Sequence, residues 1–165
     1  MTEIREFKPS DTQAVGRLIF ETYGKINLAF IPAEDRGPYL GPFQHAYSSD
    51  PEHQKEIAGL IDAPIVYVAK QDGKIVGVLR GSPGRLHSLF VDQTQHQKGI
   101  GRKLHDRFEA QCREAGAEKI TLASTLFAVP FYQKIGYKKS TGVRRGSSFN
   151  GEGFKWQPMK KLLIS

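Results

Sequence analysis

The residues between Leu89 and Leu104 have the types and spacing of an anion-binding turn. An apolar strand is followed by a polar turn, and Gly99 and Gly101 then lead into a helix. The first N–H groups of a helix lack partners within it, and the helix dipole adds partial positive charge at that end. Glycines let a phosphate approach the backbone, and Lys98 and Arg102 supply positive charge. The segment therefore predicts a phosphate-binding cradle, and an ordinary strand-to-helix turn is the alternative.

Two other phosphate-binding patterns are missing from this turn. No Gly-Lys-Ser/Thr triplet follows it, which excludes a Walker-type nucleotide loop. The third glycine of the dinucleotide-binding fingerprint is absent as well. The anion must therefore be identified from other parts of the chain.

The predicted elements place this turn inside an α+β fold. Turn residues and apolar periodicity predict strands over 2–7, 65–70, 74–81, 85–91, 118–124, 137–142 and 153–160, and helices from a capping box at Ser10, over 51–61, from Ile100 to about 115, and over 127–135. The segment 25–41 has no sustained period and predicts an irregular loop with short turns. We expect a single domain over residues 1–165, with a mainly antiparallel central sheet of six to seven strands, about four flanking helices and one strand–helix–strand crossover.

Composition agrees with one globular domain that needs no covalent crosslink. The chain has 165 residues, of which 39% are hydrophobic, and a single cysteine, Cys112, which we expect to be a small core side chain. No apolar run approaches the roughly 18 residues of a membrane span. The first residues have no apolar signal region. These features predict a cytoplasmic protein that does not associate with membranes. The sequence leaves the oligomeric state open, with a homodimer as one candidate.

The charge is unevenly distributed along the chain. Residues 1–64 contain 6 Lys and Arg against 10 Asp and Glu, a net charge of −4, whereas residues 65–165 contain 18 against 7, a net charge of +11. The basic part favours an anionic partner, for which nucleic acid, an anionic surface and a phosphate-rich cofactor are all candidates. No recognition helix or stacking-aromatic motif supports nucleic acid.

Two segments together resemble the signatures of the GNAT acetyltransferase family. The first is Val91-x-x-x-x-His96-Gln97-Lys98-Gly99-Ile100-Gly101, and the second, about 25 residues later, is Ala128-Val129-Pro130-Phe131-Tyr132-Gln133-Lys134-Ile135-Gly136-Tyr137. The order of elements resembles the family along essentially the whole chain, most weakly over 25–62. The resemblance implies a GNAT-like fold in which acetyl-coenzyme A is the cofactor and the backbone amides of the first segment hold its pyrophosphate.

The resemblance also implies the residues that contact the cofactor. They are Leu89, Phe90, Val91, His96, Gln97, Lys98, Gly99, Ile100, Gly101, Arg102, Thr125, Phe131 and Lys134. His96 departs from the usual Arg or Gln, but only its backbone amide need contact phosphate. Thr125 stands where the family often has Asn, and a hydroxyl replaces only part of the hydrogen bonding of an amide. Lys103 is a further candidate for the phosphate charge, with ordinary surface charge as the alternative for each cation.

Acetyl transfer to an amine needs two proton handlers, because the amine must lose a proton and the thiolate must gain one. Tyr132 matches the family position of the general acid, with a packing aromatic as the alternative. His87 occupies the position of the usual base and has a suitable pKa near 6.5. Strand alternation predicts that His87, Leu89 and Val91 share one face. A structural histidine is the alternative for His87, and ordered water or Glu21 could serve as the base instead.

The resulting prediction is an N-acetyltransferase that moves an acetyl group directly to a primary amine of a small molecule or peptide, through a tetrahedral intermediate. The resemblance implies that backbone N–H groups around Leu89 to Val91 hold the oxyanion of this intermediate. A catalytically silent acyl-coenzyme A sensor of the same fold and a basic nucleic-acid-binding domain are the alternatives. No metal site is predicted, and His45, His53 and His105 are interpreted as surface histidines. We expect the basic stretch 138–145 to be a solvated loop or a contact with an acidic partner.

The acceptor side is the least defined part of the prediction. In the family it is built from the first helical region and the last strands, here 25–41 and 144–154. An aromatic wall could come from Tyr23, Phe30, Tyr39, Phe43 and Phe149, with core packing as the alternative for each. The acidic first 64 residues favour a cationic amine.

Overall fold

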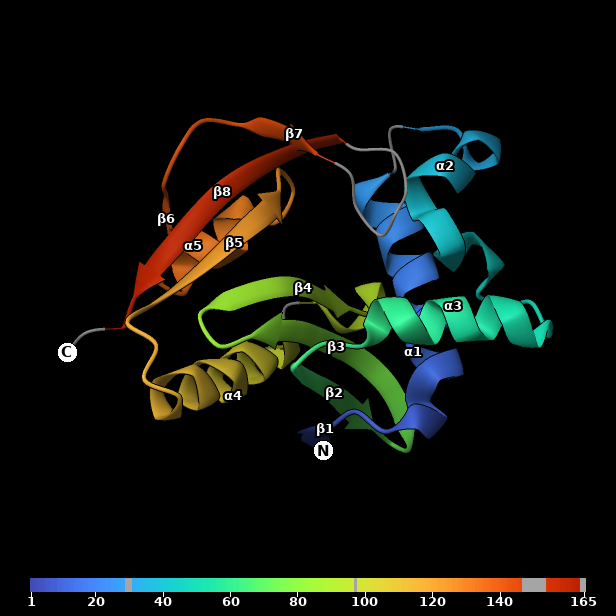
Figure 1. Cartoon of the computed structure of the whole chain (residues 1–165), viewed down its shortest axis with the longest axis horizontal. Helices are drawn as coiled ribbons and strands as arrows, with labels where there is room; N and C mark the ends of the chain where they lie inside the picture. Colours follow the sequence, from blue (N-terminus) through green and yellow to red (C-terminus); the bar gives the residue numbers. More distant parts are fainter. Residues whose placement is uncertain (29–30, 97, 147–153, 164–165) are drawn as a thin grey trace.

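The helices and strands follow one another in the predicted order (Figure 1). The structure is a computed structural model that describes residues 1–28, 31–96, 98–146 and 154–163. The strands are β1 (Thr2–Glu6), β2 (Ile65–Gln71), β3 (Lys74–Ser82), β4 (Arg85–Val91), β5 (Lys119–Thr125), β6 (Lys138–Lys139), β7 (Arg144–Gly146) and β8 (Phe154–Leu162). The α-helices are α1 (Thr12–Thr22), α2 (Gly37–Leu40), α3 (Pro51–Ile61), α4 (Ile100–Glu114) and α5 (Val129–Lys134).

The strands form one mixed sheet. Its order is β1-β2-β3-β4-β5-β8-β6, and β7 pairs with β8. Only the β4–β5 pair is parallel among the described pairs, and α4 connects these two strands. The α+β fold with one crossover is therefore confirmed. The described part has eight strands rather than six or seven, because residues 144–146 of the expected basic loop pair with 154–156 as β7.

The sheet opens between β4 and β5. The register of this pair holds a single partnership, Arg85 with Thr121, whereas β3 and β4 are partnered from Ser82 to Gly77. Beyond Arg85 the two parallel strands diverge, and their ribbons splay apart in Figure 1. Strand edges in such an opening keep N–H and C=O groups that no neighbouring strand satisfies. The opening therefore offers backbone hydrogen bonds to a bound molecule.

A β-bulge at His87 changes which side chains share a face of β4. Arg80 is opposite Ser88, but the next residue of β3, Gly81, is opposite Leu86, so His87 is the additional residue. Leu86 consequently packs in the same core as Leu89 and Val91. The prediction that His87 shares their face is wrong, because unbroken alternation does not hold across a bulge.

Two cores lie on opposite faces of the sheet. Helix α4 covers one face, where Leu104 and Phe108 pack on β2 and β3, and α1 and α3 cover the other, where Ile19 and Ile57 pack on Val78 (Figure 1). Apolar positions at helical spacing in each helix produce this arrangement. Cys112 is buried in the α4 core, as predicted.

One local prediction differs from the structure, and another agrees with its described part. Helix α1 begins at Thr12 rather than from a cap at Ser10, because Asp11 accepts hydrogen bonds from the Lys8 N–H and the Arg5 guanidinium and a 3-10 turn forms over Pro9–Asp11. The expected irregular loop 25–41 contains short helical turns in its described part, and Leu28 and Leu40 are buried there. None of the described helices combines the length and the apolar character that crossing a membrane requires.

Candidate active site

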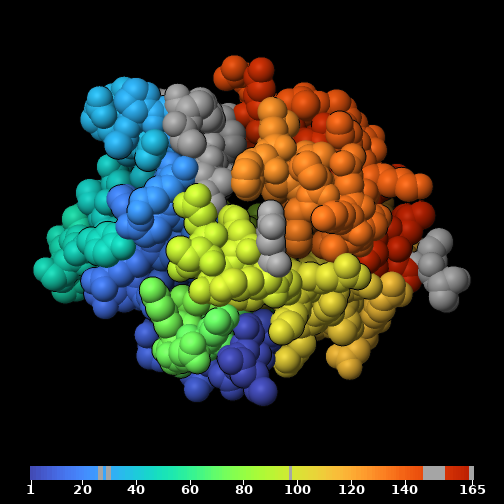
Figure 2. Space-filling model, turned by 180° about the vertical axis from the view of Figure 1, so that it is seen from behind, coloured from blue at the N-terminus to red at the C-terminus, as the bar shows by residue number. Residues whose placement is uncertain are grey.

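A cavity of about 1050 Å³ lies at the opening between β4 and β5. Its lining residues come from α1, α3, β3, β4, the start of α4, β5, α5 and β8. Twelve of the lining residues form two opposing sides, which are named here after the helices next to them. The α4 side consists of Gly99, Ile100, Gly101, Arg102, Phe131 and Lys134, and the α1–α3 side consists of Thr22, Tyr23, Leu60, Arg80, Ser88 and Phe90. In the space-filling view from behind, the yellow-green segment after β4 and the yellow α4 adjoin the orange segment of β5 and α5 (Figure 2).

Backbone groups of β4 point into the opening. The Asp92 N–H donates to the Val76 carbonyl of β3 at 2.8 Å. Because backbone groups alternate in direction along a strand, the N–H groups of Leu89 and Val91 point away from β3 and toward β5. The carbonyl of Val91 does so too, and it accepts a 2.8 Å hydrogen bond from Nε2 of His96. Two backbone donors are thus directed into the opening between β4 and β5.

The start of α4 is shaped by two glycines with different roles. Gly99 is the N-cap and has φ of 80°, in the left-handed region that favours glycine, and no side chain caps the helix at this residue. A Cβ on Gly101 would lie 3.3 Å from the Phe131 ring and 3.6 Å from Val91. Gly99 therefore sets the direction of the helix, and Gly101 allows α4 to pack closely on α5 and β4. The uncapped first turn of α4 leaves N–H groups available to an anion.

Tyr132 lies in the wall of the cavity with its ring buried among aromatic groups. It is 5% exposed, and its ring meets those of Phe131 and Tyr137 edge-on, at centroid distances of 5.2 and 5.5 Å. Burial raises the pKa of the Tyr132 hydroxyl above its usual value near 10. The hydroxyl therefore carries its proton at neutral pH and holds it more tightly than an ordinary tyrosine does.

A buried histidine lies behind Tyr132, where the sequence suggested a surface residue. His105 has no exposed surface, and its Nε2 lies 2.7 Å from the Tyr137 hydroxyl. Burial lowers the pKa of His105 to about 4, so the ring is neutral at pH 7. The surface interpretation fails because His105 lies on the apolar side of α4, where its Nε2 meets a tyrosine 32 residues away and its Nδ1 has no hydrogen-bond partner among the described residues.

His87 lines the cavity from the bulge and is exposed. Its Nε2 is 3.4 Å from the Ser82 hydroxyl. Burial of part of the ring lowers the pKa of His87, and the positive charges of Arg80 and Arg85 lower it further. A neutral ring with an accessible nitrogen is able to accept a proton. Glu21 is a poorer candidate, because hydrogen bonds from Lys25 and Tyr47 lower the pKa of its carboxyl and it does not line the cavity.

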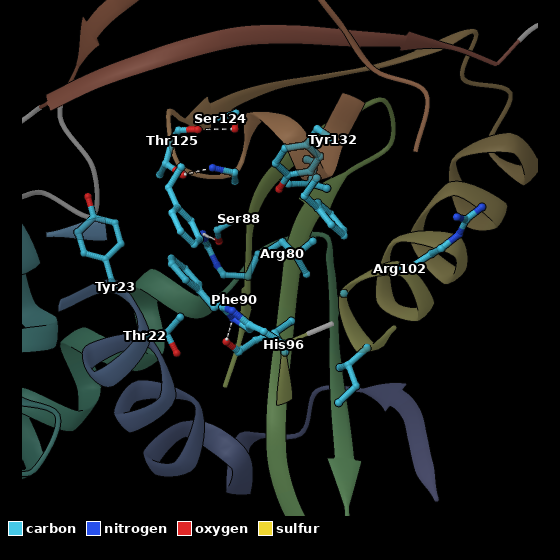
Figure 3. A pocket seen from close by; sticks show the side chains of 18 of the residues that line it. Thr22, Tyr23, Arg80, Ser88, Phe90, His96, Arg102, Ser124, Thr125 and Tyr132 are labelled. Atoms are coloured by element: carbon cyan, nitrogen blue, oxygen red, sulfur yellow. Dashed lines mark hydrogen bonds between the residues drawn. The ribbon is translucent and has the colours of Figure 1, made fainter. Parts of the chain in front are cut away.

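The structure gathers most of the predicted site residues into this cavity. Thirteen of them line it, namely His87, Leu89, Phe90, Val91, His96, Gly99, Ile100, Gly101, Arg102, Thr125, Phe131, Tyr132 and Lys134. Lys98 is exposed and is not part of the lining, and Gln97 lies outside the described residues. The Thr125 hydroxyl accepts from the Ala128 N–H at 3.3 Å, so it caps the turn before α5 (Figure 3).

The proposed aromatic wall is only partly present. Tyr23 lines the cavity, whereas Phe43 is fully buried in the core and Tyr39 packs against that core. Phe30 and Phe149 lie outside the described residues. Sequence reasoning missed Arg80, Ser88 and Trp156, which also line the cavity. No local pattern marks these three, because strand pairing and helix packing bring them there.

Comparisons with known proteins agree with this geometry. A family model described as an acetyltransferase (GNAT) domain matches residues 39–163. The chain therefore belongs to the GNAT acetyltransferase family, as the two sequence segments predicted. No curated protein sequence matches the chain.

Three solved structures illustrate the shared fold. A GCN5-related N-acetyltransferase from Rhodopseudomonas palustris has a TM-score of 0.75 and 22% identity, over 99% of this chain and 96% of that one. The PaiA N-acetyltransferase from Thermoplasma acidophilum, solved with coenzyme A, has a TM-score of 0.71 and 21% identity, over 98% and 99% of the two chains. An aminoglycoside 6'-acetyltransferase type Ii has a TM-score of 0.65 and 21% identity, over 99% and 98%. At these identities the likeness extends to the fold.

Proposed function

We propose that the protein is an N-acetyltransferase that moves an acetyl group from acetyl-coenzyme A directly to a primary amine. The β4–β5 opening carries the proposal, because two backbone donors, the uncapped start of α4 and Tyr132 all border one cavity. A long molecule with a diphosphate fits a strand edge that ends at an uncapped helix. Family membership and the coenzyme A named for one neighbour support the same ligand.

The residues of the chain have distinct tasks in this proposal. Acetyl-coenzyme A supplies an activated acetyl group as a thioester. The N–H groups around Gly99 to Gly101 bind phosphate oxygens, and Arg102 and Lys134 add positive charge at the mouth of the cavity. Both cations are exposed, so their contribution depends on ionic strength.

The proton transfers divide between two side chains. His87 accepts the proton that the amine must lose, either directly or through water. The N–H groups of Leu89 and Val91 stabilise the negative charge that develops on the carbonyl oxygen. Tyr132 donates its proton to the departing sulfur, and its hydroxyl carries that proton at neutral pH. The acid and the base therefore act from different elements, α5 and β4.

A thiol-release assay with the purified protein tests the proposal. Acetyl-coenzyme A is incubated with polyamines, aminoglycosides, amino acids and lysine peptides, and the free thiol is measured over time. We expect amine-dependent release with at least one class and an N-acetylated product of the expected mass. Calorimetry with coenzyme A runs in parallel. Binding without thiol release for any amine would indicate the silent sensor, and the absence of both would overturn the proposal.

A further inference from the structure

The helices on the α1–α3 side cover only one half of the sheet. The core that they form includes residues of β2, β3 and β4, and none of its members among the described residues comes from β5, β6 or β8. On the opposite face of these last strands, Ile120, Leu122 and Met159 pack in the same core as Tyr132 of α5 (Figure 1). In the described structure, the face of β5, β8 and β6 that turns toward the α1–α3 side is therefore left without a helix.

Four cations share this uncovered face. Directly opposite residues of paired strands point to the same face, so the register aligns Arg85, Thr121, Lys160 and Lys138 in one row across β4, β5, β8 and β6. Lys119 lies on the same face, because it precedes Thr121 by two residues. The four cationic side chains are exposed, and we name Arg85, Lys119, Lys138 and Lys160 the basic face.

No carboxylate forms an ion pair with the basic face in the described part of the chain. Arg85 donates to the Thr121 hydroxyl at 3.2 Å. The ion pairs of the described residues are formed by other cations, namely Arg5, Lys25, Arg113 and Lys161. Lys138 and Lys160 are directly opposite each other, and like charges in that position destabilise a sheet. The basic face therefore lowers the stability of the fold, and an anionic partner would offset that cost.

The basic face continues into the cavity along β5. Ala123 and Thr125 follow Thr121 on the same face of this strand, and both line the cavity. A strand rises about 3.3 Å per residue, so Ala123 lies about 7 Å along β5 from Thr121. An extended chain that lies on the basic face therefore reaches the cavity within about two or three residues.

The acidic first part of the sequence gives no support for the cationic acceptor that it suggested. All ten acidic residues of the first 64 lie in the described part of the chain, and none of them lines the cavity. Asp11 pairs with Arg5, and Glu21 pairs with Lys25. The basic face, by contrast, adjoins the cavity. The charge beside the cavity therefore favours an acceptor whose other groups are negative.

We propose that the acceptor amine belongs to an acidic polypeptide, whose carboxylates bind to the basic face while the amine enters the cavity. The inference rests on the proposed function of the same cavity. Lysine ammonium groups on flexible stems suit carboxylates that are spaced along an extended segment. Nucleic acid carries negative charge but lacks the primary aliphatic amine that the reaction needs. An acidic polypeptide accounts for both the cavity and the basic face.

Matched peptides test the inference in the wild-type protein. One pair has a free N-terminal amine and no lysine, followed by a run of Glu in one peptide and of Gln in the other. A second pair has a blocked N-terminus and a single lysine before the same runs. For the pair that is acetylated, we expect kcat/KM of the Glu peptide to exceed that of the Gln peptide by about 3- to 100-fold, because each exposed ion pair contributes about 1.5- to 5-fold.

Ionic strength provides a second readout of the same preference. Salt screens exposed charges, so the preference for the Glu peptide should shrink between about 0.05 M and 0.5 M salt. Thiol release with equal kcat/KM for the Glu and Gln peptides, or with a preference for Gln, would overturn the inference while leaving the proposed function intact.

A combined variant locates the preference on the basic face. Lys119→Gln, Lys138→Gln and Lys160→Gln together should remove most of the preference for the Glu peptide and leave kcat/KM of the Gln peptide unchanged. The control removes the same charge from three exposed lysines that do not line the cavity, by Lys8→Gln, Lys55→Gln and Lys74→Gln. It should keep the preference. A preference that survives in the first variant, or is lost equally in the control, contradicts the assignment.

Urea unfolding excludes a structural explanation for the loss. The first variant should be at least as stable as the wild type, because it removes the opposed pair of Lys138 and Lys160. A clear loss of stability would mean that these lysines support the fold, which contradicts the role proposed for them.

A binding measurement separates this inference from the proposed reaction. Labelled Glu and Gln peptides are titrated with the protein in the presence of coenzyme A, and fluorescence anisotropy gives both affinities without turnover. Tighter binding of the Glu peptide, lost in the first variant, supports the inference even where thiol release is slow. Equal affinities overturn it. A protein that binds coenzyme A but releases no thiol with any amine contradicts the proposed function instead.

Labelled single-stranded RNA and duplex DNA are titrated in parallel. We expect both to bind more weakly than the Glu peptide at the same salt concentration. Tighter binding of either nucleic acid, lost in the first variant, would assign the basic face to nucleic acid and overturn the inference.

Discussion

The two sides of the cavity are built in different ways. The α4 side comes from two short stretches of chain, the start of α4 and α5, and it offers mainly backbone N–H groups and a close contact between Gly101 and Phe131. The α1–α3 side combines side chains from α1 and the turn that follows it, from α3, and from β3 and β4, which are spread along the sequence from residue 22 to residue 90. One side presents a local backbone shape, and the other presents a set of side chains brought together by the fold.

This difference separates donor binding, which many enzymes share, from acceptor recognition, which differs between enzymes. A backbone cradle binds the same phosphate groups whatever side chains surround it, so it suits a donor shared by many enzymes. A set of side chains drawn from several elements, by contrast, suits the recognition of one particular acceptor. Substitutions on the two sides should therefore have separable effects on donor binding, turnover and acceptor choice.

The largest expected effect comes from Tyr132, where the two sides meet. Tyr132→Phe should lower kcat by about 100- to 1000-fold, because it removes the proton donor and keeps the ring. The affinity for coenzyme A should change by less than about twofold. Thiol-release kinetics and calorimetry measure the two quantities. Tyr47→Phe is the control, since this exposed tyrosine bonds to Glu21 outside the cavity. A large loss of affinity in Tyr132→Phe would identify it as a packing residue instead.

A smaller effect on turnover is expected from His87, which acts on the acceptor rather than the donor. His87→Gln should lower kcat/KM by about 100-fold. The pKa of His87 is lowered by burial and by Arg80 and Arg85, so the wild-type rate should fall on acidification only below pH 6.5. This acidic limb should disappear in His87→Gln. Arg85→Gln removes one positive charge and should move the limb to higher pH.

The pH–rate profile of kcat/KM between pH 5 and 8 measures these effects. His53→Gln is a suitable control, because His53 bonds to Ser48 on the surface and does not line the cavity. An acidic limb that survives in His87→Gln would place the base elsewhere.

The contrast between local backbone shape and side chains brought together by the fold also explains which features the sequence predicts. The strand, turn and helix around Gly99 are local, so their order and the two family segments are readable from adjacent residues. The bulge at His87 is not local, because it arises from the register of β4 against β3, and it overturns the predicted side-chain alternation. The strand β7 likewise depends on pairing with β8, which the basic composition of 144–146 conceals.

Side-chain functions that depend on distant partners are the least predictable. No sequence motif marks Arg80. Its hydrogen bond to the C-terminal end of α3 forms only because that end packs beside β3. The sequence favours a surface position for His105 because it does not show that Tyr137 approaches this residue. Polar residues in such positions cannot be distinguished from solvent-exposed ones by periodicity alone.

His105 allows a test of the interior behind the α4 side. Its pKa is about 4 in the folded protein against about 6.5 when unfolded, so the unfolded chain binds a proton first on acidification. This contribution to stability is complete above pH 6.5 and is lost as the pH falls toward 4. Between pH 7.5 and pH 5 the loss is about 2 kcal/mol. Urea unfolding at both pH values measures it.

The matched variant for this measurement is His105→Gln, which lacks the titrating ring. The difference between the two free energies of unfolding should be about 2 kcal/mol smaller in the variant than in the wild type, whatever its absolute stability. An identical pH dependence in both proteins would mean that His105 is protonated or exposed in the folded state.

The smallest expected effect compares two glycines that have the same space around them. Neither Gly99 nor Gly59 would bring a Cβ within 4 Å of any neighbour that the structure describes, but Gly99 has φ of 80° and Gly59 lies inside α3. Gly99→Ala should lower the free energy of unfolding by about 1 kcal/mol, because an L residue is strained in the left-handed region. Gly59→Ala should raise it by about 0.5–1 kcal/mol, since alanine favours a helix interior. Urea unfolding of both variants measures the opposite signs, and calorimetry should show weaker coenzyme A binding only in Gly99→Ala. Stabilisation by both substitutions would show that α4 does not begin with a left-handed residue, and the backbone cradle on the α4 side would then be wrongly assigned.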